Sequence, residues 1–465
     1  MSDSTTLLIL GASGDLTERL LLPGLGSLIA GGEQTDLDLL DGLTVIGSGR
    51  SEKSTEEWRG TVKTAFESTG AKGDLASRTI DAAEYVVADP TKQDDWRGLL
   101  QKVQGDLIVY FALPPSVVAT VANVLADLDL PEHTELALEK PFGNDAEDAV
   151  HLNEQLAKVV SEQQIHRVDH FLGHRVVLAT LALRFNNRLF EPVWNAESVE
   201  RVEITYDEEL GLEGRAGYYD TAGALRDMLQ SHLLQVLSVV ATEPPASIAE
   251  IDLRDATAAA LRATALWSGD PVFPNTTAPS RRARYTAGEV AGRHFPDYAS
   301  EEGVDADRGT ETLAQIALEV RTARWAGVPF ILRSGKAIGQ PAASIVLTLR
   351  PVNHRPDGQT GDGQAERIVL GFKPPRVSLS LTAEGGSMPF ELEPGTVDGD
   401  LPKSAVTEYG EVLRGVLGDD PTLSVRGDVA VQCWRIVQPV LDSWSKNEVP
   451  LEEYAAGTKG PASWT

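Results

Sequence analysis

Short apolar runs alternate with longer stretches of helical pattern over the first third of the chain. The runs predict buried strands at residues 5–10, 43–46, 84–88, 106–113 and 136–138. Strands that alternate with helices in this way are typical of a doubly wound, parallel sheet. We therefore expect an α/β, Rossmann-like domain over residues 1–172.

The pattern changes after this first domain. Apolar and polar residues alternate at residues 199–206, 344–349, 367–372 and 377–381, which predicts half-exposed strands of an antiparallel sheet. Apolar positions at helical spacing predict helices at residues 222–240 and 429–445. Residues 173–465 are therefore expected to form an α+β domain.

The composition is that of an ordinary globular protein, but the charge is strongly negative. Hydrophobic residues make up 42% of the 465 residues, and the formal net charge is -28. Such a chain repels nucleic-acid phosphates and anionic lipids, and its apolar runs are too short to span a bilayer. Cys433 is a single cysteine, so no disulfide can form within the chain. We expect a cytoplasmic protein with a small-molecule substrate and no nucleic-acid or membrane partner.

A glycine-containing turn follows the first predicted strand. It consists of residues 11–16 and includes Gly11, Ser13, Gly14, Asp15 and Leu16. A turn between a strand and a helix directs backbone amides at a phosphate, which is typical of dinucleotide sites. A plain strand-to-helix turn has the same pattern, so this alternative stays open.

Arg50 follows the second predicted strand. Proteins selective for NAD usually carry a carboxylate at this place, which binds the ribose 2′-hydroxyl. An arginine instead favours the 2′-phosphate of NADP, so NADP is the expected coenzyme, with NAD as the alternative. The arginine of a solvated loop would look the same in the sequence.

An acid and two imidazoles lie close together near the predicted domain boundary, at Asp169, His170 and His174. Titratable groups in such a place suit a sugar-oxidising site. The alternative is a polar cap at the start of the second domain.

Several segments, taken in order along the chain, resemble the glucose-6-phosphate dehydrogenase family. They are Gly-Ala-Ser-Gly-Asp-Leu at 11–16, Phe-Ala-Leu-Pro-Pro at 111–115, Glu-Lys-Pro-Phe-Gly at 139–143, Arg-Val-Asp-His at 167–170, and residues 213–220, 226–235, 328–336, 418–419 and 454–461. The resemblance implies a Rossmann-like domain followed by an α+β domain with a large, mostly antiparallel sheet, assembled as a homodimer or a dimer of dimers. It also implies an enzyme of the pentose phosphate pathway that transfers hydride from C1 of glucose 6-phosphate to NADP and forms the 1,5-lactone.

The resemblance also gives roles to individual residues. His232 is implied to be the base that takes the proton of the C1 hydroxyl, which suits an imidazole with an ordinary pKa of about 6.5. Asp169 would bond to this histidine, and Lys140 would lie where coenzyme and sugar meet. The other residues implied to contact the sugar are His170, Phe171, His174, Glu208, Asp227, Lys336 and Lys373. Those implied to contact the coenzyme are Gly11, Ser13, Gly14, Asp15, Leu16, Arg50, Ala112, Leu113, Pro114 and Lys140. Without the resemblance, His232 is better interpreted as a core residue of its helix.

The chain departs from the family pattern where the sugar phosphate is expected to bind. Phe171 stands in place of a tyrosine, and His174 in place of a lysine. Losing one charge-assisted bond to phosphate costs about 1.5–3 kcal/mol, although Arg175 or Lys373 could compensate. Two alternatives therefore stay open: the same chemistry on an unphosphorylated or differently substituted aldose, and an NADP-binding homologue without turnover.

Overall fold

The computed structural model describes residues 4–361, 363–385 and 388–464, which form two compact units. Unit 1 contains the chain through His174 and two later segments, Pro245–Asp255 and Lys403–Trp434. Unit 2 contains Arg175–Pro244, Ala256–Pro402 and the chain from Arg435 onward. The domain boundary between residues 172 and 173 stays a prediction, and the contacts assign the two later segments to unit 1.

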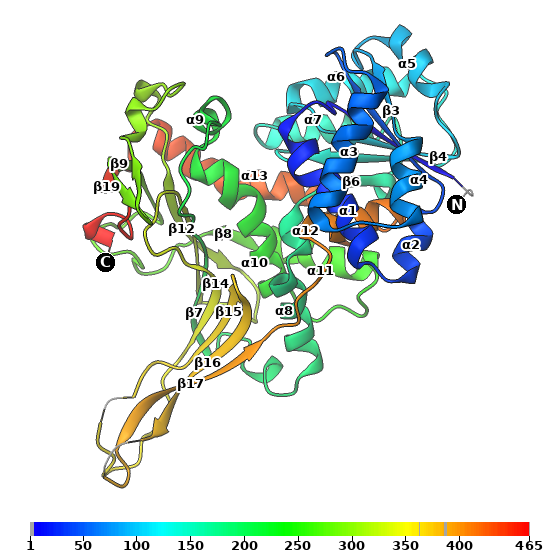
Figure 1. Ribbon diagram of the computed structural model, residues 1–465. Helices are drawn as coiled ribbons and strands as arrows, with labels where there is room; N and C mark the ends of the chain where they lie inside the picture. Colours follow the sequence, from blue (N-terminus) through cyan, green and yellow to red (C-terminus); the bar gives the residue numbers. More distant parts are fainter. Residues whose placement is uncertain (1–3, 362, 386–387, 465) are drawn as a thin grey trace. The chain divides into compact units, whose positions relative to one another are not determined.

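Unit 1 is built on a seven-stranded sheet (Figure 1). The strands run parallel in the order β6-β5-β4-β1-β2-β3, and β18 pairs antiparallel with β6 at one edge. They are β1 (Thr5–Leu10), β2 (Leu43–Gly49), β3 (Glu84–Val87), β4 (Asp106–Phe111), β5 (Thr134–Glu139), β6 (Ile165–Val168) and β18 (Ser424–Val425). This order confirms the predicted Rossmann-like fold, in which ligands bind at the carboxyl ends of β1 and β4, where the strand order reverses.

Helices cover the sheet of unit 1. α1 (Leu22–Gly31) packs against α3 (Thr55–Thr69), α4 (Asp74–Ala82) and α12 (Glu408–Leu417), and α6 (Pro115–Ala126) packs against α7 (Ala146–Leu156). Two shorter helices are α2 (Gln34–Leu40) and α5 (Gln93–Leu100). Leu413 of α12 lies in the same buried core as Leu25 of α1, so a late segment completes the early part of the unit.

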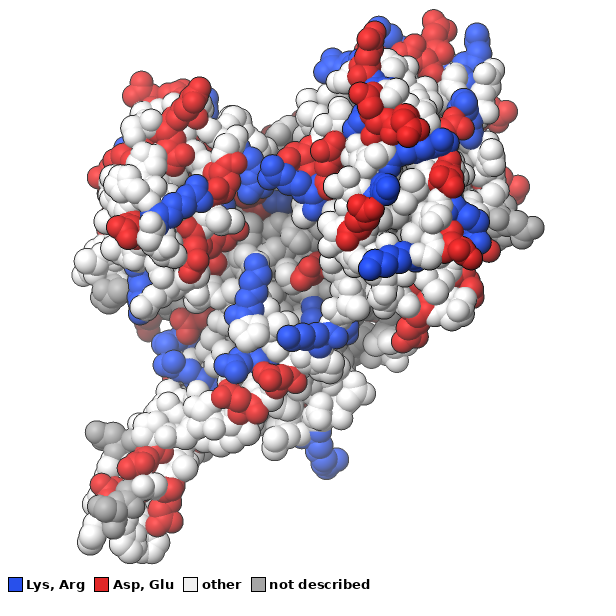
Figure 2. All heavy atoms as spheres, viewed as in Figure 1, with Lys and Arg blue, Asp and Glu red and all other residues white. Residues whose placement is uncertain are grey.

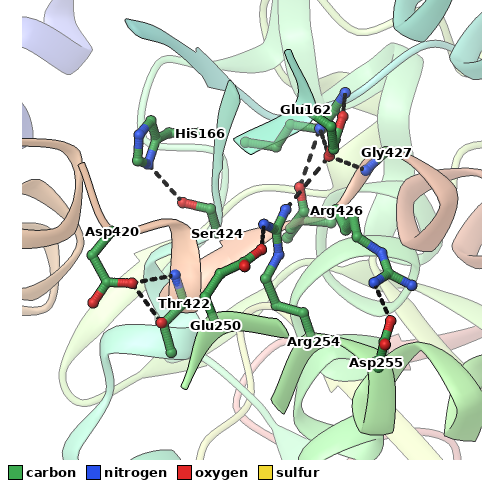
Figure 3. Close-up of polar contacts among 12 residues, drawn as sticks. Glu162, His166, Glu250, Arg254, Asp255, Asp420, Thr422, Ser424, Arg426 and Gly427 are labelled. Carbon is green, nitrogen blue, oxygen red and sulfur yellow. Dashed lines mark hydrogen bonds and ion pairs between the residues drawn. The ribbon is translucent and has the colours of Figure 1, made fainter. Parts of the chain in front are cut away.

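A buried ion-pair network attaches the later segments to the first part of unit 1 (Figure 3). The Glu162 carboxylate accepts hydrogen bonds from Arg167 at 2.8 Å and from the Gly427 amide at 2.9 Å, and it pairs with Arg254 at 3.4 Å. Arg167 and Arg254 are almost fully buried, and removing Glu162 would cost Arg167 its carboxylate partner, whereas Arg254 would keep its ion pair with Glu250. One carboxylate thus holds three separated chain segments.

Unit 2 is built on a ten-stranded, mostly antiparallel sheet in the order β17-β16-β15-β14-β7-β13-β12-β9-β19, with β8 paired to β12. Its strands are β7 (Val199–Tyr206), β8 (Thr264–Leu266), β9 (Ser280–Thr286), β12 (Leu313–Val320), β13 (Pro329–Gly335), β14 (Ala343–Leu349), β15 (Arg367–Phe372), β16 (Pro375–Glu384), β17 (Leu392–Asp400) and β19 (Leu451–Ala455). A separate ribbon pairs β10 (Gly288–Val290) with β11 (Arg293–Phe295). Within this sheet, β7 and β13 are parallel neighbours. The large, mostly antiparallel sheet confirms the α+β fold predicted for this half of the chain.

The central helical segment of unit 2 differs from the sequence prediction. A continuous α-helix was expected at residues 222–240, but Gly223 has non-helical dihedrals (φ 67, ψ 174) and divides it. Next come a π-helical segment, η5 (Leu225–Leu233), and then α10 (Leu234–Ala241). In η5, Leu225 and all residues from Met228 to Leu233 are buried, so the buried side is wider than a single α-helical stripe.

The other helices of unit 2 flank this segment and the sheet. They include α8 (Arg175–Asn186), which contacts β15 and β16, and α9 (Ala216–Ala224). Two further helices, α11 (Glu250–Arg262) and α13 (Gly427–Ser445), contribute residues to both units. The predicted helix at residues 429–445 is confirmed by α13.

Charged side chains of both signs lie on the surface. On the face shown in Figure 2, acidic and basic side chains are interspersed over most of the surface, whereas the arm at the lower left shows acidic side chains. Within residues 4–361, 363–385 and 388–464, none of the helices combines the length and apolar character needed to cross a bilayer.

Candidate active site

The glycine turn lies where the carboxyl ends of β1 and β4 meet. Gly11 has φ 84, and a Cβ atom there would lie 2.2 Å from the Ala112 carbonyl oxygen, so the close approach of these two loops requires glycine. The Gly11 and Ala12 amides donate to the Ser48 carbonyl, which ties the turn to the end of β2. The amides of Gly11, Ala12 and Gly14 thus bond within the protein, and phosphate binding by this turn stays a prediction.

The residues around this turn are open to solvent. Ser13, Gly14 and Asp15 are exposed, and the π-helical segment η1 (Thr17–Leu21) follows them. Asp15 pairs with Arg19 at 2.7 Å on the surface. Arg50 is exposed directly after β2, where a coenzyme ribose lies in this type of fold. Ala112, Leu113 and Pro114 form the turn between β4 and α6 on the other side.

Lys140 follows β5 next to a half-buried acid, Glu139, that the sequence analysis did not single out. Glu139 accepts a hydrogen bond from the Tyr110 hydroxyl at 2.5 Å, and the Tyr409 hydroxyl also bonds to it. Burial raises the pKa of Glu139 to about 7, although the tyrosine hydroxyls and the Lys140 ammonium act in the opposite direction. A carboxyl that titrates near neutral pH therefore lies beside the lysine.

The acid and the two histidines lie on a tight turn after β6. Asp169 is buried and caps the 3-10 segment η3 (His170–Gly173), because its carboxylate accepts a hydrogen bond from the Phe171 amide at 3.0 Å. The His170 ring stacks on Tyr409 of α12, with ring centroids 5.1 Å apart. The capping alternative for this cluster is thus realised at Asp169, and it does not exclude a catalytic role.

Phe171 and His174 are both buried, which the sequence could not show. Phe171 is 3% exposed and meets the His174 ring edge-on, with centroids 4.8 Å apart. His174 Nδ1 lies 3.2 Å from a carboxylate oxygen of Glu408. The hydrogen bond from His174 lowers the pKa of Glu408 to about 2. A carboxylate therefore already bonds one nitrogen of the histidine that replaces the expected lysine.

His232 lies in unit 2, on the η5 segment that packs against β7, β12 and β13. It is 2% exposed. Leu225 is the first residue of this segment, and its amide donates a hydrogen bond to the Glu311 carboxylate at 2.9 Å. Gly223 allows this contact, because a Cβ there would lie 2.5 Å from a Glu311 oxygen. Glu311 thus fixes the start of the helical segment that carries His232.

Glu208 and Lys336 come together at the carboxyl ends of β7 and β13. The Lys336 ammonium lies 2.6 Å from a Glu208 oxygen and 5.1 Å from the centre of the Tyr219 ring. Lys336 is 5% exposed, so it is held in place by these contacts. Asp227 of η5 accepts a hydrogen bond from the Tyr218 hydroxyl at 3.3 Å and also acts electrostatically on Tyr219. Cations and carboxylates suited to sugar hydroxyls are therefore clustered in unit 2.

Lys373 lies at the end of β15, on the same edge of this sheet. Its ammonium is 5.2 Å from the Tyr206 ring, which ends β7. Next to Tyr206, burial raises the pKa of Asp207 to about 6, even though Arg333 donates to both of its oxygens at 3.1–3.2 Å. Asp207 and Arg333 were missed by the sequence analysis, as were Tyr206, Tyr219 and Glu311.

The predicted residues fall into two groups. The glycine turn, Arg50, Lys140 and residues 169–174 belong to unit 1, whereas Glu208, Asp227, His232, Lys336 and Lys373 belong to unit 2. Glu408 and Tyr409 join the first group from a segment more than 200 residues later, so no local pattern could have indicated them. Glu139, by contrast, could have been noticed as the acid next to Lys140.

A glycine turn at the switch point of a doubly wound sheet, followed by a unit with a large antiparallel sheet, is typical of a nicotinamide-dependent oxidoreductase. Two family models cover nearly the whole chain: "Glucose-6-phosphate dehydrogenase, NAD binding domain" matches residues 8–178, and "Glucose-6-phosphate dehydrogenase, C-terminal domain" matches residues 181–465. The chain belongs to the glucose-6-phosphate dehydrogenase family, and the resemblance noted in the sequence is confirmed.

Individual relatives agree with this assignment. The chain is 36% identical to a glucose-6-phosphate 1-dehydrogenase of Gluconobacter oxydans (98% of this chain, 94% of the relative) and 34% identical to that of Treponema pallidum (98% and 92%). Among solved structures, it is similar to the glucose-6-phosphate 1-dehydrogenase of Mycobacterium avium, with a TM-score of 0.82 and 32% identity (99% and 96%). A glucose-6-phosphate dehydrogenase in complex with its substrate glucose-6-phosphate gives a TM-score of 0.85 at 28% identity (99% and 96%).

Proposed function

We propose that this protein oxidises glucose 6-phosphate at C1 to the 1,5-lactone and passes the hydride to NADP. The observation that carries the proposal is membership of the family over nearly the full length of the chain. The family relatives are enzymes by name, so an NADP-binding homologue without turnover is not proposed.

The chemistry requires a base. Loss of hydride from C1 leaves an electron-poor carbon unless the C1 hydroxyl loses its proton in the same step. We propose that His232 takes this proton and that Asp169 stabilises the imidazolium that forms. Bound NADP supplies the hydride acceptor. Lys140 positions the sugar, Glu208 and Asp227 accept hydrogen bonds from its hydroxyls, and Lys336 lines the same pocket as a cation.

The role of His232 has a direct test. His232→Asn should abolish turnover and leave the dissociation constant of the coenzyme unchanged. His294→Asn, at an exposed histidine of the same unit, is the matched control and should keep the wild-type rate. A substantial rate in His232→Asn would refute its role as the base.

The coenzyme preference rests on Arg50. Its exposed side chain after β2 can meet the 2′-phosphate of NADP, and the described end of β2 offers no carboxylate for a 2′-hydroxyl. Arg50→Ala should therefore raise KM for NADP at least tenfold and leave KM for NAD nearly unchanged, because one charge-assisted bond to phosphate is lost. Equal effects on both coenzymes would contradict the proposed preference.

An unphosphorylated aldose is the second candidate substrate, and one observation favours it. His174 is already bonded to the Glu408 carboxylate, and Phe171 beside it has no polar group to offer a phosphate.

Lys373, whose ammonium lies over Tyr206, is the residue of unit 2 that we propose as a compensating cation for phosphate.

One assay separates the two substrates. The purified protein receives glucose, glucose 6-phosphate and other aldoses in turn, with NADP or NAD, and the absorbance of the reduced coenzyme is followed. Turnover of free glucose without turnover of the phosphate would overturn the first proposal. Phe171→Tyr combined with His174→Lys should lower KM for glucose 6-phosphate about 10- to 100-fold. An unchanged KM would show that this turn does not bind the phosphate.

Assembly and location complete the proposal. We propose a cytoplasmic homodimer or dimer of dimers, as the family resemblance implies, in the pentose phosphate pathway. Light scattering after gel filtration would report the mass, and a monomer at micromolar concentration would contradict it.

A further inference from the structure

Three side chains with metal-binding atoms gather at one edge of the unit 1 sheet. Glu135 and His166 come from the amino-terminal ends of the adjacent strands β5 and β6, and Asp419 comes from the turn after α12. The ligand atoms of the three residues all lie within 4.8 Å of one another. His166 Nε2 is 3.1 Å from a Glu135 oxygen, and Asp419 lies within hydrogen-bonding reach of the same carboxyl group.

The distance between these atoms suits a shared ion. Zinc bonds to histidine nitrogen and carboxylate oxygen at about 2.0–2.2 Å, so two tetrahedral ligands on one ion lie about 3.4 Å apart. The separation of 3.1 Å between His166 and Glu135 is close to this value. Small side-chain rotations would therefore convert the hydrogen-bonded arrangement into a coordinated one.

The surroundings of the cluster hold the histidine in one orientation. The ring of His166 is fully buried, and its Nδ1 lies 3.2 Å from the Ser424 hydroxyl (Figure 3). A metal-binding histidine usually bonds its second ring nitrogen to a polar group in this way, which fixes the first nitrogen toward the ion. Ser424 itself is held by the pairing of β18 with β6.

The charges around the cluster favour a cation. Asp106 and Asp419 act electrostatically on Glu135, and Asp419 and Asp420 act on His166. The basic groups that face the cluster are His133 and Arg254. The hydrogen bond between the Glu135 and Asp419 carboxyl groups needs a proton on one of them, and a divalent ion would displace this proton and bind both carboxylates. Asp419 is exposed, so the ion has a path from solvent.

We propose that Glu135, His166 and Asp419 bind one divalent transition-metal ion, with Zn²⁺ preferred and water completing the coordination. One imidazole with two carboxylates suits Zn²⁺ better than Mg²⁺ or Ca²⁺, which prefer oxygen ligands alone. The ion would tie the turn after α12 to β5 and β6. Lys140 follows the opposite end of β5, about 16 Å away along the strand, so this site is separate from the chemistry proposed above.

The first experiment compares three forms of chelator-treated, tag-free protein by calorimetric titration with Zn²⁺. Asp419→Asn removes one charged ligand and keeps the side-chain shape, and asparagine tolerates the positive φ of 54 at this position. Asp420→Asn changes the net charge equally at the next residue, which is not one of the three ligands, and is the matched control for the electrostatic effect of losing one charge near His166. We expect one ion per chain in wild type and in Asp420→Asn, and at least tenfold weaker binding in Asp419→Asn. Equal Zn²⁺ affinity in wild type and Asp419→Asn, or an equal loss in both variants, would overturn the proposal.

A second experiment tests the histidine without removing it. Ser424→Ala deletes only the group that orients His166, and such outer contacts typically contribute 10- to 100-fold to metal affinity. We expect a loss in that range for Zn²⁺, and a visible Co²⁺ absorption band that appears in wild type and weakens in Ser424→Ala and in Asp419→Asn. Zn²⁺ should also raise the melting temperature of wild type and Asp420→Asn but not of Asp419→Asn. A Co²⁺ spectrum and a melting shift that are the same in all forms would show that the three residues form a hydrogen-bonded network only.

Discussion

Replacing Glu139 by glutamine should stabilise unit 1 at alkaline pH and leave it nearly unchanged at acid pH. Burial raises the pKa of Glu139 from 4.5 to about 7, so the folded protein holds this proton more tightly than the unfolded chain does. Between pH 4.5 and 7 the unfolded state therefore binds fewer protons, and the free energy of unfolding falls as pH rises through this window. Above pH 7 the penalty is constant.

The size of the effect follows from the same pKa values. A rise of about 2.5 in pKa corresponds to about 3 kcal/mol, at 1.36 kcal/mol for each unit. Glutamine resembles the protonated acid and can still accept the hydrogen bond from Tyr110. We therefore expect Glu139→Gln to be more stable than wild type by up to about 3 kcal/mol at pH 8 and by less than about 1 kcal/mol at pH 5.

Calorimetry at pH 5, 6, 7 and 8 measures this difference. For a unit of this size, 1 kcal/mol shifts the melting temperature by about 2–4 °C, so the variant should melt about 6–12 °C higher at pH 8. Glu154→Gln, at an exposed acid of α7, is the control and should follow wild type at every pH. Tyr110→Phe removes a donor that lowers the pKa of Glu139, so it should destabilise the protein more at pH 8 than at pH 5. A Glu139→Gln effect that does not depend on pH would refute the reasoning.

Three further substitutions test single contacts. Gly11→Ala places a Cβ 2.2 Å from a carbonyl oxygen and should weaken coenzyme binding at least tenfold, measured by fluorescence titration, whereas Gly60→Ala, with open space around it, should not. Gly223→Ala combines a positive φ with a Cβ 2.5 Å from the Glu311 carboxylate and should lower the free energy of unfolding of unit 2 by about 2 kcal/mol or more in urea titration. Lys336→Met leaves the Glu208 carboxylate without its partner and should raise KM for the sugar at least tenfold with KM for the coenzyme unchanged; similar changes in both would contradict a role in sugar binding.

The sequence predicted most strongly those elements whose signal is local. The apolar run at residues 5–10 became β1, and the alternating run at residues 199–206 became β7, because burial on one or both faces of a strand sets the residue pattern directly. The glycine at position 11 was also recognisable, since only a close backbone approach requires it there.

Other features depend on contacts that no local pattern encodes. The π-helical turns of η5 have the composition of an α-helix, so the sequence predicted the wrong helical spacing around His232. Glu408 and Tyr409 face His174 and His170 only because α12 returns to unit 1 late in the chain. The raised pKa of Glu139 likewise comes from burial, which depends on the complete fold.

The late return of α12 and β18 has a consequence for synthesis on the ribosome. The nascent chain presents β6 with an unpaired edge, and the apolar side chains of α1 without their cover, until residues 403–434 have emerged. Exposed strand edges and apolar surface of this kind promote aggregation, and pairing across such long loops is slow. A fragment that ends at His174 should therefore be insoluble when expressed alone, and co-expressing the segment at residues 403–434 should restore part of its solubility.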